Sequence, residues 1–356
     1  LLPDHDIHTC IDFHGKTPLA ASPKMWEDLI ISETRDGFGF VLKDNVNDLG
    51  YQSVTTPGSL KAYYEALENF GTWDWSDVVA PAIKHAEQGF LVRPHVAFWW
   101  NYGANYGRVG VDERLRYSKT GAESYFDSSG NLKKIGDKVK ISGMAETLKK
   151  IAKYGPDIFY KGEIAEKISE DMKKNGGLLS YEDLSTYSTK WTDPLVGKYR
   201  DFGVSTNHPP GGGIMLLEML NILENFNLSK LGHNSTEYIR VVCEAMKQAT
   251  VDKESFVGDP DFVNVPIRRL LSKKHARQCS KHILSGQKIN IDRIGQFESK
   301  DTTHVSVVDK HGNCVTMTHS LGMPSGVITD GLGFMYNGCM AVFDPRPGRA
   351  GSIEPG

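Results

Sequence analysis

The chain has 356 residues, of which 39% are apolar and 24% charged, and its formal net charge is −3. This composition is typical of a soluble globular protein with one large domain or two ordinary ones. The weak charge gives no reason to expect nucleic acid or an anionic membrane as a partner, and no run of about 18 apolar residues predicts a membrane-spanning helix.

The two ends of the sequence look cut. The chain begins Leu1-Leu2-Pro3 without an initiator methionine or a signal-peptide pattern, and it ends directly after a loop rich in Pro, Gly and Arg. We therefore expect a chain truncated at both ends, and the sequence leaves the localisation open between cytoplasm and periplasm.

Helical periodicity dominates the first two thirds of the chain. Helices are predicted over residues 58–67, 77–88, 145–154, 162–174, 213–225 and 235–252, with a capped helical turn at 180–184. Ser59 is the expected N-cap of the first helix, and Gly89 is expected to end the second. Residues 191–204 read as strands around a turn at 199–203. A layered protein of helices and sheets follows from this order.

Several polar or aromatic groupings have two interpretations. Residues 209–213 precede an apolar helix as a phosphate-binding loop would, but they lack the spacing and the Lys-Ser/Thr ending of such loops. His5, Asp6, His8 and Cys10 offer metal-ligand types without a zinc spacing. Trp99 and Trp100, with Tyr102 and Tyr106, could line a pocket or pack in the core.

The cysteines predict neither disulfides nor a metal site. They are five, scattered and without CxxC spacing, namely Cys10, Cys243, Cys279, Cys314 and Cys339. No cofactor is expected.

The segment that carries chemistry is a predicted β-hairpin with strands at 301–309 and 314–318 around a Gly/Asn turn. Thr302 and Thr303 stand where the first strand begins, after a polar segment, 287–300, that reads as an exposed loop. If the bond before Thr302 were cut, its new α-amine, with a pKa of roughly 8, could deprotonate its own hydroxyl. The alternative is that these threonines only favour a strand.

Several motifs, taken in order, resemble the γ-glutamyltranspeptidase family of N-terminal-nucleophile hydrolases. They are Thr55-Thr56-Pro57-Gly58, the segments 155–162, 175–178, 181–184, 209–213 and 258–263, and Asp301-Thr302-Thr303-His304 with Gly312-Asn313. The resemblance covers nearly the whole chain. It implies an α+β fold, a four-layer αββα sandwich.

The resemblance also implies self-cleavage before Thr302, which would divide one precursor into a large subunit (1–301 here) and a small subunit (302–356 here) that together build one domain. Thr302 would be the nucleophile, its amine the base, and Ser320 a supporting hydroxyl. The acyl group of a small-molecule amide would pass through an acyl-enzyme to water or an amine. The family's oxyanion hole would lie beyond residue 356, so we expect this piece alone to be inactive.

The donor pocket departs from the family pattern at four positions. His14 stands where the family has an arginine, Val342 where it has an acidic residue, Cys339 in place of a glutamine, and Gly322 in place of an asparagine. A γ-glutamyl group carries an α-carboxylate and an α-ammonium, which need charged partners. These departures predict an acylase or amidohydrolase for a less zwitterionic acyl group.

Two other interpretations stay open. The first is a genuine γ-glutamyltransferase or glutathione hydrolase that uses Lys16 or another residue for the carboxylate. The second is an unprocessed homologue that only binds ligands.

Overall fold

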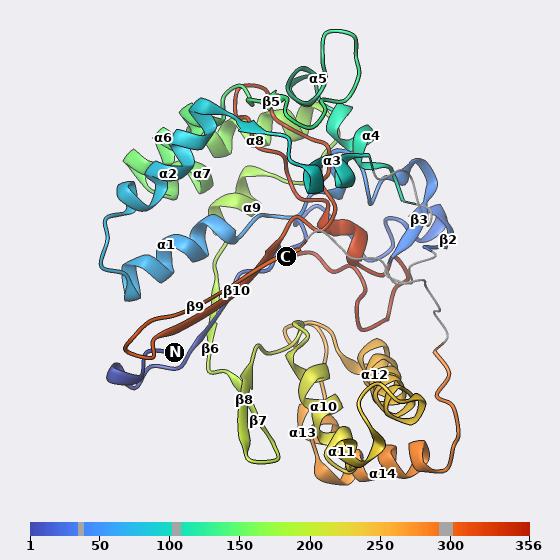
Figure 1. The fold of residues 1–356 in the computed structure, drawn as a ribbon. Coiled ribbons are helices and arrows are strands. Elements are labelled where there is room, and N and C mark those ends of the chain that lie inside the picture. The colour runs from blue at the N-terminus through green and yellow to red at the C-terminus, as the bar shows by residue number, and fades with distance from the viewer. Residues whose placement is uncertain (35–38, 102–107, 292–301) are drawn as a thin grey trace.

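The computed structural model describes residues 1–34, 39–101, 108–291 and 302–356, and it shows a mixed α+β protein (Figure 1). The strands of the described residues form five separate antiparallel pairs. The pairs are β1 (Cys10–Asp12) with β6 (Lys190–Thr192), β2 (Ile30–Glu33) with β3 (Phe40–Leu42), β4 (Phe90–Leu91) with β5 (Lys138–Val139), β7 (Leu195–Tyr199) with β8 (Phe202–Thr206), and β9 (Thr302–Val308) with β10 (Cys314–Ser320).

Helices account for most of the regular structure. Those before β6 are α1 (Ser59–Phe70), α2 (Trp75–Gln88), α3 (Pro94–Trp100), α4 (Val111–Arg116), α5 (Lys119–Tyr125), α6 (Met144–Tyr154), α7 (Asp157–Tyr160), α8 (Glu163–Lys174) and α9 (Tyr181–Thr186). Those after β8 are α10 (Gly213–Leu223), α11 (Leu228–Leu231), α12 (Thr236–Phe256), α13 (Ile267–Leu270) and α14 (Lys273–Leu284).

The longer predicted helices are confirmed, with small changes at their ends. Ser59 is the first residue of α1 rather than its N-cap, which is Gly58 and makes no side-chain capping bond. Gly89 follows α2 with φ +73°, a conformation that favours glycine. Helix α9 begins with a complete capping box, in which Ser180 and Asp183 satisfy each other's backbone N–H groups.

The predicted hairpin is also confirmed. Strands β9 and β10 pair in unbroken register from Cys314 with Val308 to Ser320 with Thr302. The N-terminal residue lies beside the turn end of this hairpin (Figure 1), where Leu1 and Cys314 exchange two backbone hydrogen bonds of 2.8 Å. Valines on both strands remain exposed to solvent: Val305, Val307, Val308 and Val315.

The buried core is divided between two parts of the molecule. Helices α10–α14 gather on one side of β7 and β8 (Figure 1), and two apolar clusters in this part are built from residues between 195 and 289 only. The largest cluster lies in the other part, around α7, α8 and α9, and includes Ile164, Ile168 and Met172. Trp100 is partly buried against a separate apolar cluster that includes Tyr125, and it lies edge-on to the Tyr125 ring at 5.4 Å between ring centres, whereas Tyr102 and Tyr106 fall outside the described residues.

No helix among the described residues is long and apolar enough to cross a bilayer. All five cysteines lie among the described residues, and no two of them are joined in a disulfide bond.

Candidate active site

The predicted nucleophile and its supporting hydroxyl lie side by side. Thr302 is the first residue of β9 and Ser320 the last of β10, and the strand register pairs the two residues directly. The Thr302 hydroxyl donates a hydrogen bond of 3.2 Å to Ser320 Oγ, which also accepts one of 3.0 Å from the Gly322 backbone N–H. Thr302 is exposed, while Asp301 and its bond to Thr302 fall outside the described residues.

Side-chain alternation gives the hairpin a polar face that carries Thr302. His304 and Ser306 follow at two-residue intervals, so they share this face. The two nitrogens of His304 lie 2.7 Å from Thr318 Oγ1 and 3.0 Å from Ser306 Oγ. A row of hydroxyl and imidazole groups therefore continues from the predicted nucleophile along both strands.

Two of the predicted pocket residues adjoin Ser320. Gly322 has φ +63°, and a Cβ at this position would lie 3.1 Å from Cys339 Sγ. The Cys339 thiol donates to the Leu321 carbonyl at 3.4 Å. Gly322 and Cys339 therefore lie against each other, one on the loop after β10 and the other at the start of the 3₁₀ helix Cys339–Val342.

Asn337 connects this loop to the segment that holds His14. Its side-chain oxygen accepts from the N–H and the hydroxyl of Thr55 and from the N–H of Cys339, at 3.0, 2.9 and 3.1 Å, and its amide donates to the Thr55 carbonyl at 2.9 Å. Thr56 and Lys16 in turn exchange two backbone hydrogen bonds. A Cβ on Gly15 would lie only 2.2 Å from Thr55 Oγ1, so glycine is required there.

His14 is paired with an acidic neighbour. Its Nδ1 lies 2.5 Å from Asp12 Oδ1, and its side chain is 60% exposed. The hydrogen bond to Asp12 raises the pKa of His14. Burial alone would raise the pKa of Asp12. The hydrogen bond from His14 lowers it, and the pKa of Asp12 stays below its usual range.

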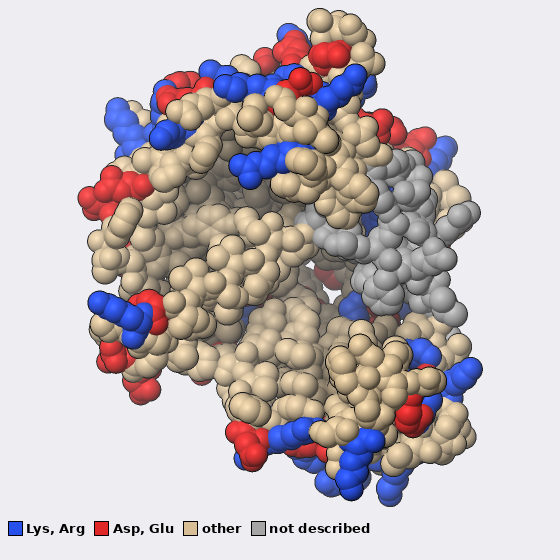
Figure 2. All heavy atoms as spheres, viewed as in Figure 1, with Lys and Arg blue, Asp and Glu red and all other residues tan. Residues whose placement is uncertain are grey.

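The fourth predicted pocket residue lies at the end of the same short helix as Cys339. Val342 is 55% exposed and offers no charge or hydrogen-bonding side chain. The face that Figure 2 presents is hollowed at its centre, and uncharged residues line most of the hollow while Lys, Arg, Asp and Glu gather at the rim.

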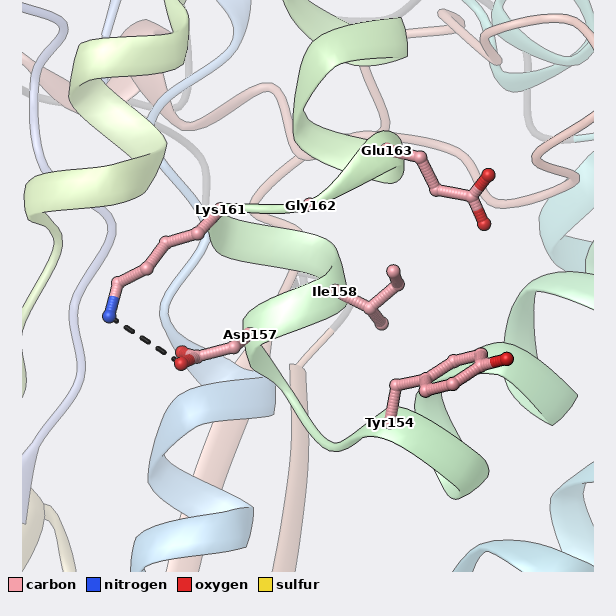
Figure 3. Close-up of a pocket in the computed structure, with 6 residues that line it drawn as sticks. All are labelled: Tyr154, Asp157, Ile158, Lys161, Gly162 and Glu163. Carbon is pink, nitrogen blue, oxygen red and sulfur yellow. Dashed lines mark ion pairs between the residues drawn. The ribbon is translucent and has the colours of Figure 1, made fainter.

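A second hollow lies elsewhere and contains none of the predicted residues. It is open, and it is lined by Tyr154, Asp157, Ile158, Lys161, Gly162 and Glu163 from the α6–α8 region (Figure 3). An exposed ion pair of 3.5 Å joins Lys161 to Asp157, and the lining offers no nucleophile with an adjacent base.

One group of side chains that could bind a metal ion was not predicted from the sequence. Glu218, Asp252 and His275 come together from three helices. The available signal was that Glu218 is the single charged residue of the apolar helix α10. The ligand-type residues considered at His5, Asp6, His8 and Cys10 do not gather their ligand atoms. Within the described ranges, Glu218, Asp252 and His275 form the one group close enough to hold a metal ion.

Comparisons with known proteins agree with the motif order. The family model described as Gamma-glutamyltranspeptidase matches residues 4–356. The Escherichia coli (strain K12) "Glutathione hydrolase proenzyme" is 35% identical over 96% of this chain and 57% of its own length. The "Acylase ACY 1 proenzyme" of Pseudomonas sp. (strain SE83) is also 35% identical, over 98% of this chain and 61% of its own.

A solved structure supports the fold class. The cephalosporin acylase from Bacillus halodurans superimposes with a TM-score of 0.77 at 26% identity, over 97% of this chain and 61% of that one. The predicted fold of the N-terminal-nucleophile hydrolase type is thereby confirmed. The chain spans about three fifths of the length of the curated relatives named above.

Proposed function

Because the chain belongs to the gamma-glutamyltranspeptidase family, we propose that its protein is an acylase or amidohydrolase in which Thr302 is the nucleophile. The observation that supports this most is the direct pairing of Thr302 with Ser320 at the open end of an exposed hairpin. Both relatives named above are proenzymes by name, in keeping with an enzyme matured from one precursor.

In the proposed maturation step, the Thr302 hydroxyl attacks the carbonyl carbon of Asp301. The carbon–nitrogen bond breaks, the nitrogen leaves as the protonated α-amine of Thr302, and the Asp301 acyl group is held as an ester. Water then hydrolyses the ester, which leaves a carboxylate on Asp301 and a free hydroxyl on Thr302. The products are a large subunit that ends at residue 301 and a small subunit that begins at residue 302.

In the catalytic cycle, the new α-amine accepts the proton of the Thr302 hydroxyl as this oxygen attacks the substrate's amide carbonyl. The amine then returns the proton to the leaving nitrogen, and an acyl-threonine ester remains. Ser320 Oγ, 3.2 Å from Thr302 Oγ1, fixes the direction of the nucleophile through their hydrogen bond. Water or an amine then accepts the acyl group.

The proposed acyl group rests on the side chains at the positions where the family resemblance places the donor pocket. Val342 cannot pair with an ammonium, and by that resemblance Gly322 and Cys339 stand where the family has side-chain amides. A charged group that binds without an opposite charge or a hydrogen-bonding partner gives up hydration that nothing replaces. We therefore assign the pocket to an acyl group without an α-ammonium, such as a short or aromatic acyl chain.

The runner-up is a genuine γ-glutamyltransferase or glutathione hydrolase. Lys16 favours it, because this cation lies on the same segment as His14, and its Nζ is 5.9 Å from the centre of the Tyr187 ring. The equal identity of 35% to a glutathione hydrolase and to an acylase does not separate the two candidates.

The test is a panel of acyl anilides, γ-glutamyl, short aliphatic and aromatic, measured on the full-length gene product. We expect kcat/KM for at least one simple acyl anilide to exceed that for the γ-glutamyl anilide by about tenfold or more, which corresponds to about 1.4 kcal/mol. A γ-glutamyl anilide hydrolysed as fast as every other would reject the acylase assignment and leave the runner-up.

A pair of substitutions tests the pocket itself. His14→Arg with Val342→Asp restores one positive and one negative partner, so γ-glutamyl anilide hydrolysis should rise while simple acyl anilides lose rate. A matched control, His5→Arg with Val196→Asp, makes the same chemical changes at two other exposed residues and should alter neither rate.

A further inference from the structure

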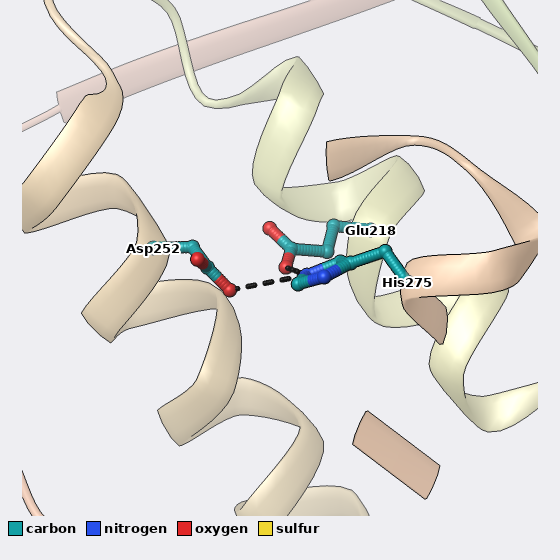
Figure 4. A group of neighbouring side chains, drawn as sticks. All are labelled: Glu218, Asp252 and His275. Atoms are coloured by element: carbon teal, nitrogen blue, oxygen red, sulfur yellow. Dashed lines mark hydrogen bonds and ion pairs between the residues drawn. The ribbon is translucent and has the colours of Figure 1, made fainter. Parts of the chain in front are cut away.

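A buried cluster of two carboxylates and one imidazole lies among the helices of residues 213–284. Glu218 comes from α10, Asp252 from α12 and His275 from α14, and their side chains point toward one another (Figure 4). His275 Nε2 lies 2.9 Å from Glu218 Oε1 and 3.2 Å from Asp252 Oδ2. One ligand atom from each residue lies within 4.8 Å of the other two.

The cluster is closed off from solvent. Glu218 is 1% exposed, Asp252 is 5% exposed, and the His275 side chain is 13% exposed. Gln248 Nε2 donates to Asp252 Oδ2 at 2.6 Å and fixes that carboxylate in place. Glu218 and Asp252 both lie against the same nitrogen, His275 Nε2, so two acidic groups are held close together and a proton or a cation has to compensate their charge.

Within the described part of the chain, no lysine or arginine pairs with either carboxylate. Lys273, on the same helix as His275, binds instead to Asn221 Oδ1 at 2.6 Å and to Glu224 Oε2 at 2.5 Å. Among the described side chains, His275 is the one that can give these two carboxylates a positive partner, and a bound cation in its place would serve the same purpose.

We propose that Glu218, Asp252 and His275 bind one divalent transition-metal ion, with Zn²⁺ as the best fit. Carboxylate oxygens and imidazole nitrogen bind Zn²⁺ at about 2.0–2.2 Å, which puts tetrahedral ligand atoms about 3.3 Å apart. The distances of 2.9 and 3.2 Å from Nε2 are close to this spacing. Ca²⁺ needs six to eight oxygen ligands, more than these side chains supply.

Cys279 is not one of the proposed ligands. Its Sγ lies 3.5 Å from His275 Nε2 and 3.9 Å from Nδ1, so the thiol sits beside the ring rather than beyond Nε2. Three protein ligands leave a fourth position for water. Since each ligand comes from a different helix, the ion would join α10, α12 and α14.

The test uses the purified chain after treatment with a chelator and dialysis. We expect it to bind one equivalent of Co²⁺ with visible d–d absorption, and Zn²⁺ should displace this band. Co²⁺ should also broaden the NMR signals of the His275 ring, and this measurement can be made on the parent chain without any substitution. His275→Gln and Asp252→Asn should each weaken binding by about 100-fold or more.

Two controls separate this site from other binding. Glu224→Gln removes a carboxylate of the same helical region that pairs with Lys273, and His5→Gln removes an exposed histidine near His8; both should bind Co²⁺ as the parent chain does. The proposal is overturned if the parent chain takes up neither Co²⁺ nor Zn²⁺ at micromolar concentration, or if binding persists in a folded His275→Gln protein. If that variant does not fold, an unaffected His275 ring signal in the parent chain overturns it as well.

Discussion

At the scale of single residues, the chemistry depends on where two hydroxyls lie in a strand pair. Residue 302 opens β9 and residue 320 closes β10, so the register alone brings the two side chains to hydrogen-bond distance. A shift of one residue in either strand would turn one of them to the valine face. The unbroken pairing of the hairpin is therefore what places the proposed nucleophile beside its partner.

The charge of His14 is set by its neighbour. The hydrogen bond to Asp12 raises the pKa of His14, so Asp12→Asn should lower it toward the ordinary value of about 6.5. At a pH between the two values, the imidazole is then charged in the parent protein and neutral in the variant. An NMR titration of the His14 ring measures this directly, and an unchanged or higher pKa would contradict it.

The residues of the proposed site remain predictions, each made from a motif in continuous sequence. The contacts of the asparagine that joins two of these segments could not be predicted in this way. Asn337 is separated from Thr55 by 282 positions, and only the folded chain shows that its amide satisfies both Thr55 and Cys339. The same holds for Glu218, Asp252 and His275, which adjoin only after three helices pack together.

At the scale of structural elements, the side chain of Asn337 holds the loop with Cys339 against the strand-like segment at Thr55. Asn337→Ala would leave buried Thr55 groups without partners, at a cost of about 2–3 kcal/mol. Urea unfolding should show this loss. The exposed Asn69, at the end of α1, is the control, and Asn69→Ala should stay within about 0.5 kcal/mol of the parent.

A buried arginine holds the loop that follows β10 in place. Arg114 is 0% exposed, its guanidinium pairs with the Asp48 carboxylate, and it donates to the Pro324 carbonyl at 2.9 Å. Arg114→Met would leave Asp48 buried without this partner and should destabilise the protein by about 3–5 kcal/mol. Thermal and urea unfolding would measure this loss, with Lys119→Met, a substitution of an exposed lysine, as the control. Equal stability of the two variants would refute the role of Arg114.

Elements with local signals were predictable, and elements held only by tertiary contacts were not. The capping box at Ser180 marks the start of α9, and Gly89 marks the end of α2. Both helix ends can be predicted from the local sequence pattern alone. The helices that were not predicted are α3, α4, α5, α7, α11, α13 and α14. The first six have seven residues or fewer, too short to show a period, and α14 is rich in lysine, arginine and histidine.

At the scale of the whole molecule, the apolar clusters of residues 195–289 are separate from those around α7–α9. Ile222 is fully buried in the first part, so Ile222→Ala should cost about 2–5 kcal/mol. Because each part has its own core, amide exchange should accelerate in 195–289 and change little around Ile168. Equal acceleration in both parts would show one cooperative core instead.

The division into a large subunit, 1–301, and a small subunit, 302–356 here, is the central prediction about the whole protein. This division requires that Thr302 itself cleave the peptide bond that joins it to Asp301. Purified full-length protein, measured by intact mass and N-terminal sequencing beside its Thr302→Ala variant, tests this most directly. We predict a small subunit that begins at Thr302, and a variant that stays a single chain without activity. A parent protein that stays uncut, or a variant that still splits before residue 302, would contradict the account.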